Sequence, residues 1–118
     1  VYGFSLFVII NPDKSVMDKR FAFRQDESSI YDGEWADSTA YTVRAAYDKS
    51  TDEDCEIIVV NKIWNSDNDV NTFAHESFHA AVDILEACHI KLSDDTNEVF
   101  AYLIGYFTEC VNKTANKR

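Results

Sequence analysis

A long amphipathic run in the second half of the chain most limits how this protein can fold. Between Asp69 and Cys88 the apolar residues recur at steps of three and four, the period of a helix with one buried face. They are Val70, Phe73, Ala74, Phe78, Ala81, Val82, Leu85 and Cys88. Asp67 or Asp69 can cap the first turn, because a short carboxylate accepts hydrogen bonds from the free amides there. The pattern predicts a helix over about residues 69–89, against which the rest of the domain packs.

The chain ahead of this helix has the pattern of β-strands. The segments are rich in β-branched and aromatic residues and are separated by turn residues such as Asn11 and Pro12. The candidate strands cover residues 2–10, 19–24, 39–47 and 56–64, of which the last gives the strongest signal. Residues 25–38 are expected to form a loop and residues 50–54 a charged turn.

A second amphipathic stretch follows the first helix. Its apolar stripe consists of Val99, Phe100, Leu103, Ile104, Phe107, Cys110 and Val111. Ser93 or Asp94 can cap its start, so a helix is predicted over about residues 95–112. Three to four strands within residues 1–64 and two helices predict a single α+β domain over residues 1–118. Its sheet is expected to be mostly antiparallel and to pack on the first helix.

The first predicted helix carries the motif H-E-x-x-H at residues 75–79. His75 and His79 are four residues apart, so one helical turn brings both imidazoles to the same side, where they can bind one metal ion. Glu76 lies between them and can take a proton from a water molecule held by the metal. Zinc is the expected ion, because it accepts nitrogen and carboxylate ligands and leaves a position open in catalytic sites.

Glu98, in the second helix, is the predicted third ligand, because the turn between the helices lets it return to the histidines. The alternatives are weaker. Asp83 lies about 12 Å from His75 along the helix axis and cannot share a metal with both histidines. His89 could return only if the helix ended before it, and Cys55 could supply a thiolate from a strand.

These two motifs, H-E-x-x-H at residues 75–79 and N-E-x-x-A at residues 97–101, resemble those of the gluzincin branch of the zincin metallopeptidases. The size matches the minimal, single-domain forms of that branch. The run 97–102 is also similar to small zincin-like proteins of bacteriophages and gut bacteria. The resemblance implies a zincin-like fold, Zn²⁺ as cofactor, Glu76 as the general base, and a ligand set of His75, His79 and Glu98.

Tyr102 marks a departure from the gluzincin pattern. Gluzincins often carry an Asp four residues after the glutamate ligand, where it orients the first histidine, and this chain has Tyr102 there. A phenol oxygen can accept a hydrogen bond from an imidazole N–H, but it brings no negative charge. Tyr102 is therefore a candidate for orienting His75 or, together with Tyr106, for stabilising an oxyanion.

The predicted function is zinc-dependent hydrolysis of a peptide or protein substrate. Zinc would lower the pKa of its water, and Glu76 would take the proton and pass it to the leaving amine. The strand at residues 56–64 is expected to offer a sheet edge to an extended peptide. Two alternatives remain open: a zincin-like binding protein without turnover, such as a phage accessory factor or toxin, and a zinc hydrolase of a non-peptide amide.

The composition of the chain excludes some classes of binding partner. The formal net charge of −10 argues against binding to nucleic acid or to an anionic membrane. No apolar run approaches the ~20 residues that span a bilayer. Three cysteines without a pattern imply no disulfide framework, which slightly favours the cytoplasm, although Val1 in place of a Met leaves a removed leader open.

Overall fold

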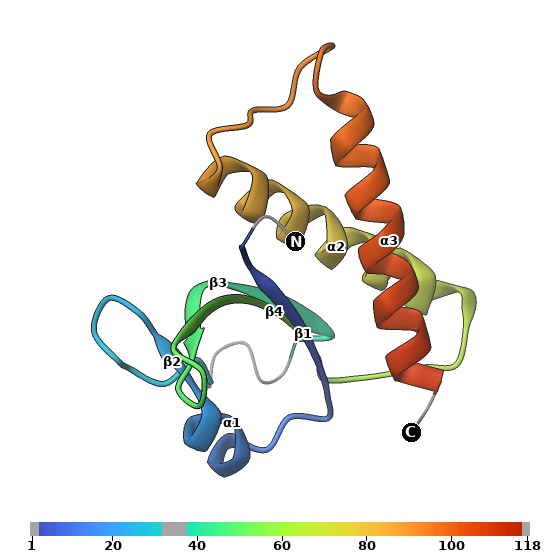
Figure 1. Ribbon diagram of the computed structural model, residues 1–118. Coiled ribbons are helices and arrows are strands. Elements are labelled where there is room, and N and C mark those ends of the chain that lie inside the picture. Colours follow the sequence, from blue (N-terminus) through green and yellow to red (C-terminus); the bar gives the residue numbers. More distant parts are fainter. Residues whose placement is uncertain (1–2, 32–37, 117–118) are drawn as a thin grey trace.

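The computed structural model describes residues 3–31 and 38–116 of the chain. These residues form a small α+β domain with a four-stranded mixed sheet and three helices (Figure 1). The elements, in chain order, are β1 (Ser5–Ile10), α1 (Lys14–Arg20), β2 (Phe21–Phe23), β3 (Ala40–Asp48), β4 (Glu53–Val60), α2 (Asp67–Ala87) and α3 (Asn97–Asn116). The predicted α+β class is confirmed. Part of the predicted loop, residues 32–37, lies outside the described residues, as does Tyr2 of the first predicted strand.

The strands lie in the order β1-β4-β3-β2. The two pairings of β3, with β4 and with β2, are antiparallel, as expected, but β1 pairs with β4 in parallel. β2 is short and pairs with β3 only over Ala46–Asp48. A register shift between Val43 and Ala46 bends β3 just before this point, and the first half of β3 continues alongside α2.

β4 lies inside the sheet, with β1 on one side and β3 on the other. Its residues alternate between two cores: Ile58 and Val60 pack with the helices α2 and α3, whereas Ile57 and Val59 pack on the opposite face. A strand covered on both faces needs a nearly continuous apolar run, which is what this segment has. The prediction that this strand offers a free edge to a peptide is therefore wrong, since both of its edges are paired.

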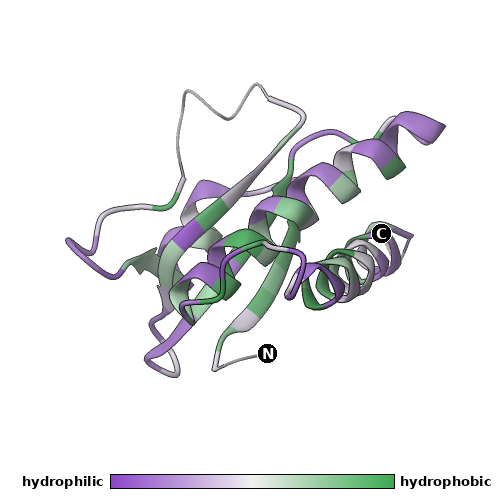
Figure 2. Cartoon of the chain, turned by 90° about the horizontal axis from the view of Figure 1, so that it is seen from above, coloured by the Kyte–Doolittle hydropathy of each residue, from purple (hydrophilic) through white to green (hydrophobic). Residues whose placement is uncertain are grey.

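The larger core fills the space between the sheet and the helices α2 and α3. Phe107 of α3 is fully buried there, together with Ile84 and Leu85 of α2. The strands in the middle of the domain are mostly hydrophobic, whereas hydrophilic residues occupy the turns (Figure 2). A smaller core on the other face includes Met17 of α1. In the part of the chain that the structure describes, no helix has both the length and the apolar character needed to cross a membrane.

α1 was not expected from the sequence. It has seven residues, of which only Met17 is buried, so its sequence does not show the repeating apolar positions of an amphipathic helix. Its start has a local cause: the Asp13 carboxylate accepts hydrogen bonds from the amides of Ser15 (2.9 Å) and Val16 (3.3 Å).

α2 begins and ends through identifiable local interactions. Ser66 is the N-cap residue, and the carboxylate of Asp69 accepts hydrogen bonds from the amides of Trp64 (3.0 Å) and Asn65 (2.8 Å). At the other end His89 has a positive φ of 63°, and Ile90 N donates to the Leu85 oxygen at 2.8 Å. This bond pattern is a Schellman motif, which stops a helix. The predicted helix is confirmed, shifted by two residues at each end.

The apolar face of α2 is rotated from the predicted one. Ser77, Ala80 and Ile84 are buried, whereas Phe78 is 41% exposed and Val70 56% exposed, although both were expected in the core. At about 100° per residue, the buried face is centred roughly opposite His75. Small residues on that face let α2 lie close to the sheet and to α3. The histidine face consequently points away from the core.

Candidate metal centre

His75 and His79 lie one turn apart on the exposed face of α2, as the motif predicts. Their Nε2 atoms are 3.1 Å apart, and the two rings meet edge to face with centroids 4.7 Å apart. Two nitrogens bound to one tetrahedral zinc, each at about 2.0–2.1 Å, lie about 3.3 Å from each other. The imidazole pair therefore already has the spacing of two ligands on one zinc ion.

Glu76 is held between α2 and β3. Its side chain is buried, with 7% of the residue exposed, although both neighbouring histidines are open to solvent. The hydroxyl of Thr42 on β3 lies 2.8 Å from Glu76 Oε1 and 3.1 Å from the Glu76 backbone oxygen. The other carboxylate oxygen, Oε2, lies 3.9 Å from His75 Nε2. The carboxylate thus lies beside the imidazole pair without a hydrogen bond to His75.

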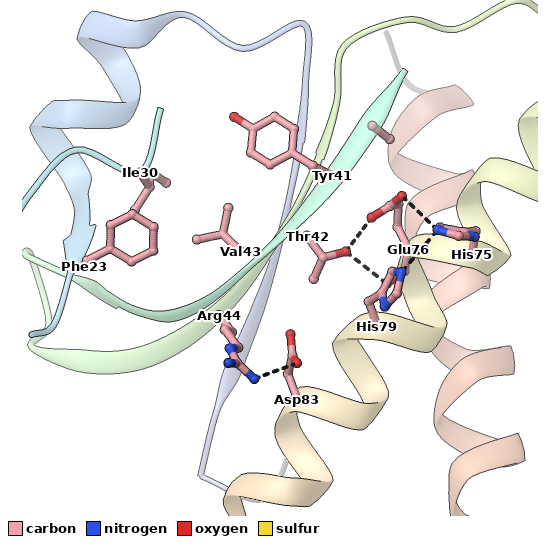
Figure 3. A pocket seen from close by; sticks show the side chains of 11 residues that line it. Phe23, Ile30, Tyr41, Thr42, Val43, Arg44, His75, Glu76, His79 and Asp83 are labelled. Atoms are coloured by element: carbon pink, nitrogen blue, oxygen red, sulfur yellow. Dashed lines mark hydrogen bonds and ion pairs between the residues drawn. The ribbon is translucent and has the colours of Figure 1, made fainter. Parts of the chain in front are cut away.

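A pocket of about 560 Å³ opens between β3 and α2 at this point (Figure 3). Its lining residues are Phe23, Ile30, Ala40, Tyr41, Thr42, Val43, Arg44, His75, Glu76, His79 and Asp83. Phe23 and Ile30 line an apolar part of the pocket, and Arg44 and Asp83, whose charged atoms are 3.9 Å apart, line a charged part. This volume lies in the range of small-molecule and peptide side-chain sites. The H-E-x-x-H motif therefore faces a pocket of mixed character.

Glu56 of β4 lies beside Asp83 and was not identified from the sequence as a residue near the site. It is 2% exposed, and its carboxyl group is hydrogen-bonded to Asp83. Burial, followed by the contact with Asp83, raises the pKa of Glu56 to about 11. Glu56 is consequently protonated at pH 7, and its carboxyl group donates a hydrogen bond to Asp83, which ties β4 to α2. The alternation of the strand, which places Glu56 on the same face as Ile58, could have indicated its burial.

We expect Glu56→Gln to change how stability depends on pH. Because the pKa of Glu56 is raised in the folded protein, the folded state binds the proton more tightly than the unfolded state does. Stability therefore falls as the pH rises from the unfolded pKa of about 4.5 towards 11, by at most about 1.4 kcal/mol per pH unit. Chemical denaturation at pH 5 to 9 should show a smaller decline for the Gln variant. An equal decline in both proteins would show that Glu56 is ionised in the fold.

Glu98 and Tyr102 are not brought to the histidines. Both are exposed on α3, Tyr102 to 71%, and Tyr102 stacks on Tyr106 with ring centroids 6.4 Å apart. At about 100° per residue, Glu98 lies roughly opposite the stripe through which α3 packs, centred on Phe107. Neither Glu98 nor Tyr102 lines the pocket between β3 and α2. In the described ranges, no three His, Cys, Asp or Glu side chains are grouped so that they could hold a metal ion.

The other candidate ligands do not join the two histidines either. Cys55 is fully buried, and its burial raises the pKa of the thiol to about 12, so it is not a thiolate. It packs on the face of the sheet opposite α2. His89 lies past the end of α2, and its positive φ stops the helix there. Asp83 is engaged with Glu56.

Comparison with family models, curated proteins and solved structures found no match for this chain. The geometry of the site and the resemblance of its motifs are therefore the basis for any functional inference.

Proposed function

We propose that this protein is a zinc-dependent metallopeptidase of the zincin type, in which His75 and His79 bind the metal and Glu76 is the general base. The observation that carries the proposal is the pairing of the two imidazoles, with Nε2 atoms 3.1 Å apart, next to a buried carboxylate at the mouth of a pocket. A surface helix that carried two histidines by chance would need neither the buried Glu76 nor its anchor on β3.

Zinc bound to the imidazoles would lower the pKa of a water molecule and polarise a substrate carbonyl. Glu76 accepts the proton of the water that attacks the carbonyl carbon, and it then gives this proton to the leaving amine. Its burial beside the pocket keeps the carboxylate near the reacting atoms. His75 and His79 reach the same space from the adjoining side of α2 (Figure 3).

The pocket favours a peptide as substrate. Phe23 and Ile30 offer an apolar surface for a substrate side chain, and Arg44 and Asp83 offer polar contacts. β3 runs along the pocket beyond the end of β2, which suits a substrate in an extended conformation. A net charge of −10 favours basic over acidic substrates at long range.

Metal analysis together with a broad peptide-cleavage profile tests the proposal. The purified protein should hold one zinc per chain and cleave at least some members of a diverse peptide library. Zinc binding without cleavage of any peptide would contradict the peptidase assignment and leave a non-catalytic zinc protein. Cleavage of a non-peptide amide alone would assign the site to a different hydrolase.

We further propose Glu98 as the third ligand, on the resemblance of its motif. Glu98 is exposed in the first turn of α3, after the connection that includes Ser93–Thr96. Because it faces away from α2, its binding to the metal requires the start of α3 to turn towards the histidines. Tyr102 lies one turn further on the same side of α3, so any role of Tyr102 in orienting His75 depends on the same movement.

Glu98→Ala tests this ligand directly. We expect the variant to bind zinc more weakly than the wild type, because a tetrahedral site would lose one of three protein ligands. Competitive zinc titration measures the change, and Glu109→Ala, another exposed glutamate on α3, is the matched control. Unchanged affinity in Glu98→Ala would remove Glu98 from the site and make the two histidines the only identified ligands.

A non-catalytic zinc-binding protein is the second candidate. The observation in its favour is that the described residues assemble only two of the expected three ligands. Such a protein would bind zinc through His75 and His79 but would show no loss of function on Glu76→Gln.

A further inference from the structure

We infer that Thr42 is the positioning residue for Glu76, which it aims at the space in front of the two imidazoles. The inference rests on the proposed function, in which Glu76 is the general base. Thr42 belongs to β3 and Glu76 to α2, and 34 positions separate them in the sequence.

The two oxygens of the Glu76 carboxylate have different surroundings. Oε1 accepts a hydrogen bond from the Thr42 hydroxyl at 2.8 Å, whereas Oε2 lies 3.9 Å from His75 Nε2, beyond hydrogen-bond distance. Fixing Oε1 therefore turns Oε2 towards the imidazole pair. Oε2 keeps its lone pairs for a water molecule, and it is the oxygen that takes the proton.

The chemistry of threonine suits this task. A β-branched residue in a strand has few side-chain rotamers, so the hydroxyl is a donor fixed in place by the sheet. Thr42 lies 3.1 Å from the Glu76 backbone oxygen as well, which keeps β3 and α2 in register at this point. Its neighbours on the same face of β3, Ala40 and Arg44, have no hydroxyl, and Arg44 faces Asp83 instead.

Without this hydrogen bond the glutamate side chain would sample several rotamers, and only some of them would face the imidazoles. Restricting the glutamate side chain to one rotamer costs on the order of 1–2 kcal/mol of conformational entropy. If Thr42 meets this cost before the reaction, the rate rises by roughly tenfold. Within the described residues the Thr42 hydroxyl is hydrogen-bonded to Glu76 and to neither histidine, so its effect on zinc binding itself should be small.

The test compares Thr42→Val, which keeps the shape but removes the hydroxyl, with Thr42→Ser, which keeps the hydroxyl. For the zinc-loaded protein we expect Thr42→Val to lower kcat roughly tenfold, with KM and zinc stoichiometry unchanged. Thr42→Ser should retain most of the activity. A second measurement needs no turnover and determines the affinity of the zinc-loaded protein for acetohydroxamate by calorimetric titration. Acetohydroxamate chelates zinc and passes its proton to an adjacent carboxylate. Its affinity should fall roughly tenfold in Thr42→Val and not in Thr42→Ser.

A double-mutant cycle separates positioning from bracing of the fold. In the Glu76→Gln background Thr42→Val should cause no further loss of kcat, because there is no carboxylate to aim. An equal loss in both backgrounds, with a lower Tm, would show that Thr42 only braces β3 against α2, and the inference would be overturned. It would also be overturned by equal acetohydroxamate affinity in the wild type and Thr42→Val.

Failure of the proposed function has a different signature. If the wild type binds zinc and acetohydroxamate but cleaves no peptide, the peptidase assignment falls, while the affinities of the Thr42 variants still decide the positioning role. If the wild type binds no zinc, both the proposed function and the inference are overturned.

Discussion

Glu76→Gln should keep the fold and the zinc and lose about 10²–10⁴-fold in kcat, the range that a general base contributes. The amide has nearly the shape of the carboxylate and can still contact the Thr42 hydroxyl, but it cannot accept a proton at neutral pH. Because Glu76 is buried with 7% exposure, its replacement by a neutral group should not lower the stability of the domain. The loss should therefore appear in turnover alone.

The measurements are zinc content, thermal unfolding and steady-state kinetics on a peptide cleaved by the wild type. Glu86→Gln is the matched control, since Glu86 is an exposed glutamate on the same helix and its change should leave all three quantities alone. If Glu76→Gln cleaves as fast as the wild type, Glu76 is not the base. If the variant also loses zinc, Glu76 contributes to metal binding, and the assignment of roles within the motif must change.

The helices α2 and α3 could be predicted from the sequence because their signals are local, whereas α1 is short and has only one buried residue. In α2 the apolar period and the spacing of His75 and His79 follow from the geometry of a single helix. The distance of 3.1 Å between their Nε2 atoms is a consequence of that same geometry. The rotation of the buried face was harder to predict, since Ala80 and Ser77 are small and add little to an apolar stripe, although they permit close packing against the sheet.

The partners of the site could not be predicted, because they depend on contacts between distant segments. Thr42 meets Glu76 only once β3 lies along α2, and a lone threonine in a strand carries no sign of this. Glu56 meets Asp83 for the same reason. The parallel pairing of β1 with β4 also joins segments far apart in the chain. By contrast, the interior position of β4 had a readable signal, since its apolar run from Ile57 to Val60 leaves no polar face.

The predicted ligand set also depends in part on contacts between distant segments, which the sequence does not reveal. His75 and His79 are fixed by one helix, but the position of Glu98 depends on how α3 turns about its own axis against α2. Phe100, Leu103 and Phe107 determine that rotation, and they place Glu98 on the outer side. Sequence spacing alone cannot fix the rotation of one helix relative to another, whereas it does fix the two histidines within a helix.

Replacing either histidine should abolish zinc binding, which is the largest expected effect on the metal. In His75→Ala or His79→Ala only one imidazole remains, and a site that loses half of its identified nitrogen ligands should not hold zinc at micromolar concentration. Because both side chains are exposed, their removal leaves no cavity and should not unfold the metal-free domain. Zinc content after dialysis and thermal unfolding of the metal-free protein measure the two effects separately.

The chain provides its own control for this experiment, because it has three histidines. His89→Ala removes an exposed imidazole just past the end of α2, in the residue with a φ of 63° that stops the helix. Zinc content should stay at one per chain in that variant, whereas the unfolding temperature should fall, since alanine tolerates a positive φ poorly. Zinc retained by His79→Ala but lost by His89→Ala would move the metal site to the end of the helix. That outcome would contradict the proposed function at its first step, because Glu76 would then lie more than three helical turns from the metal, about 20 Å along the axis.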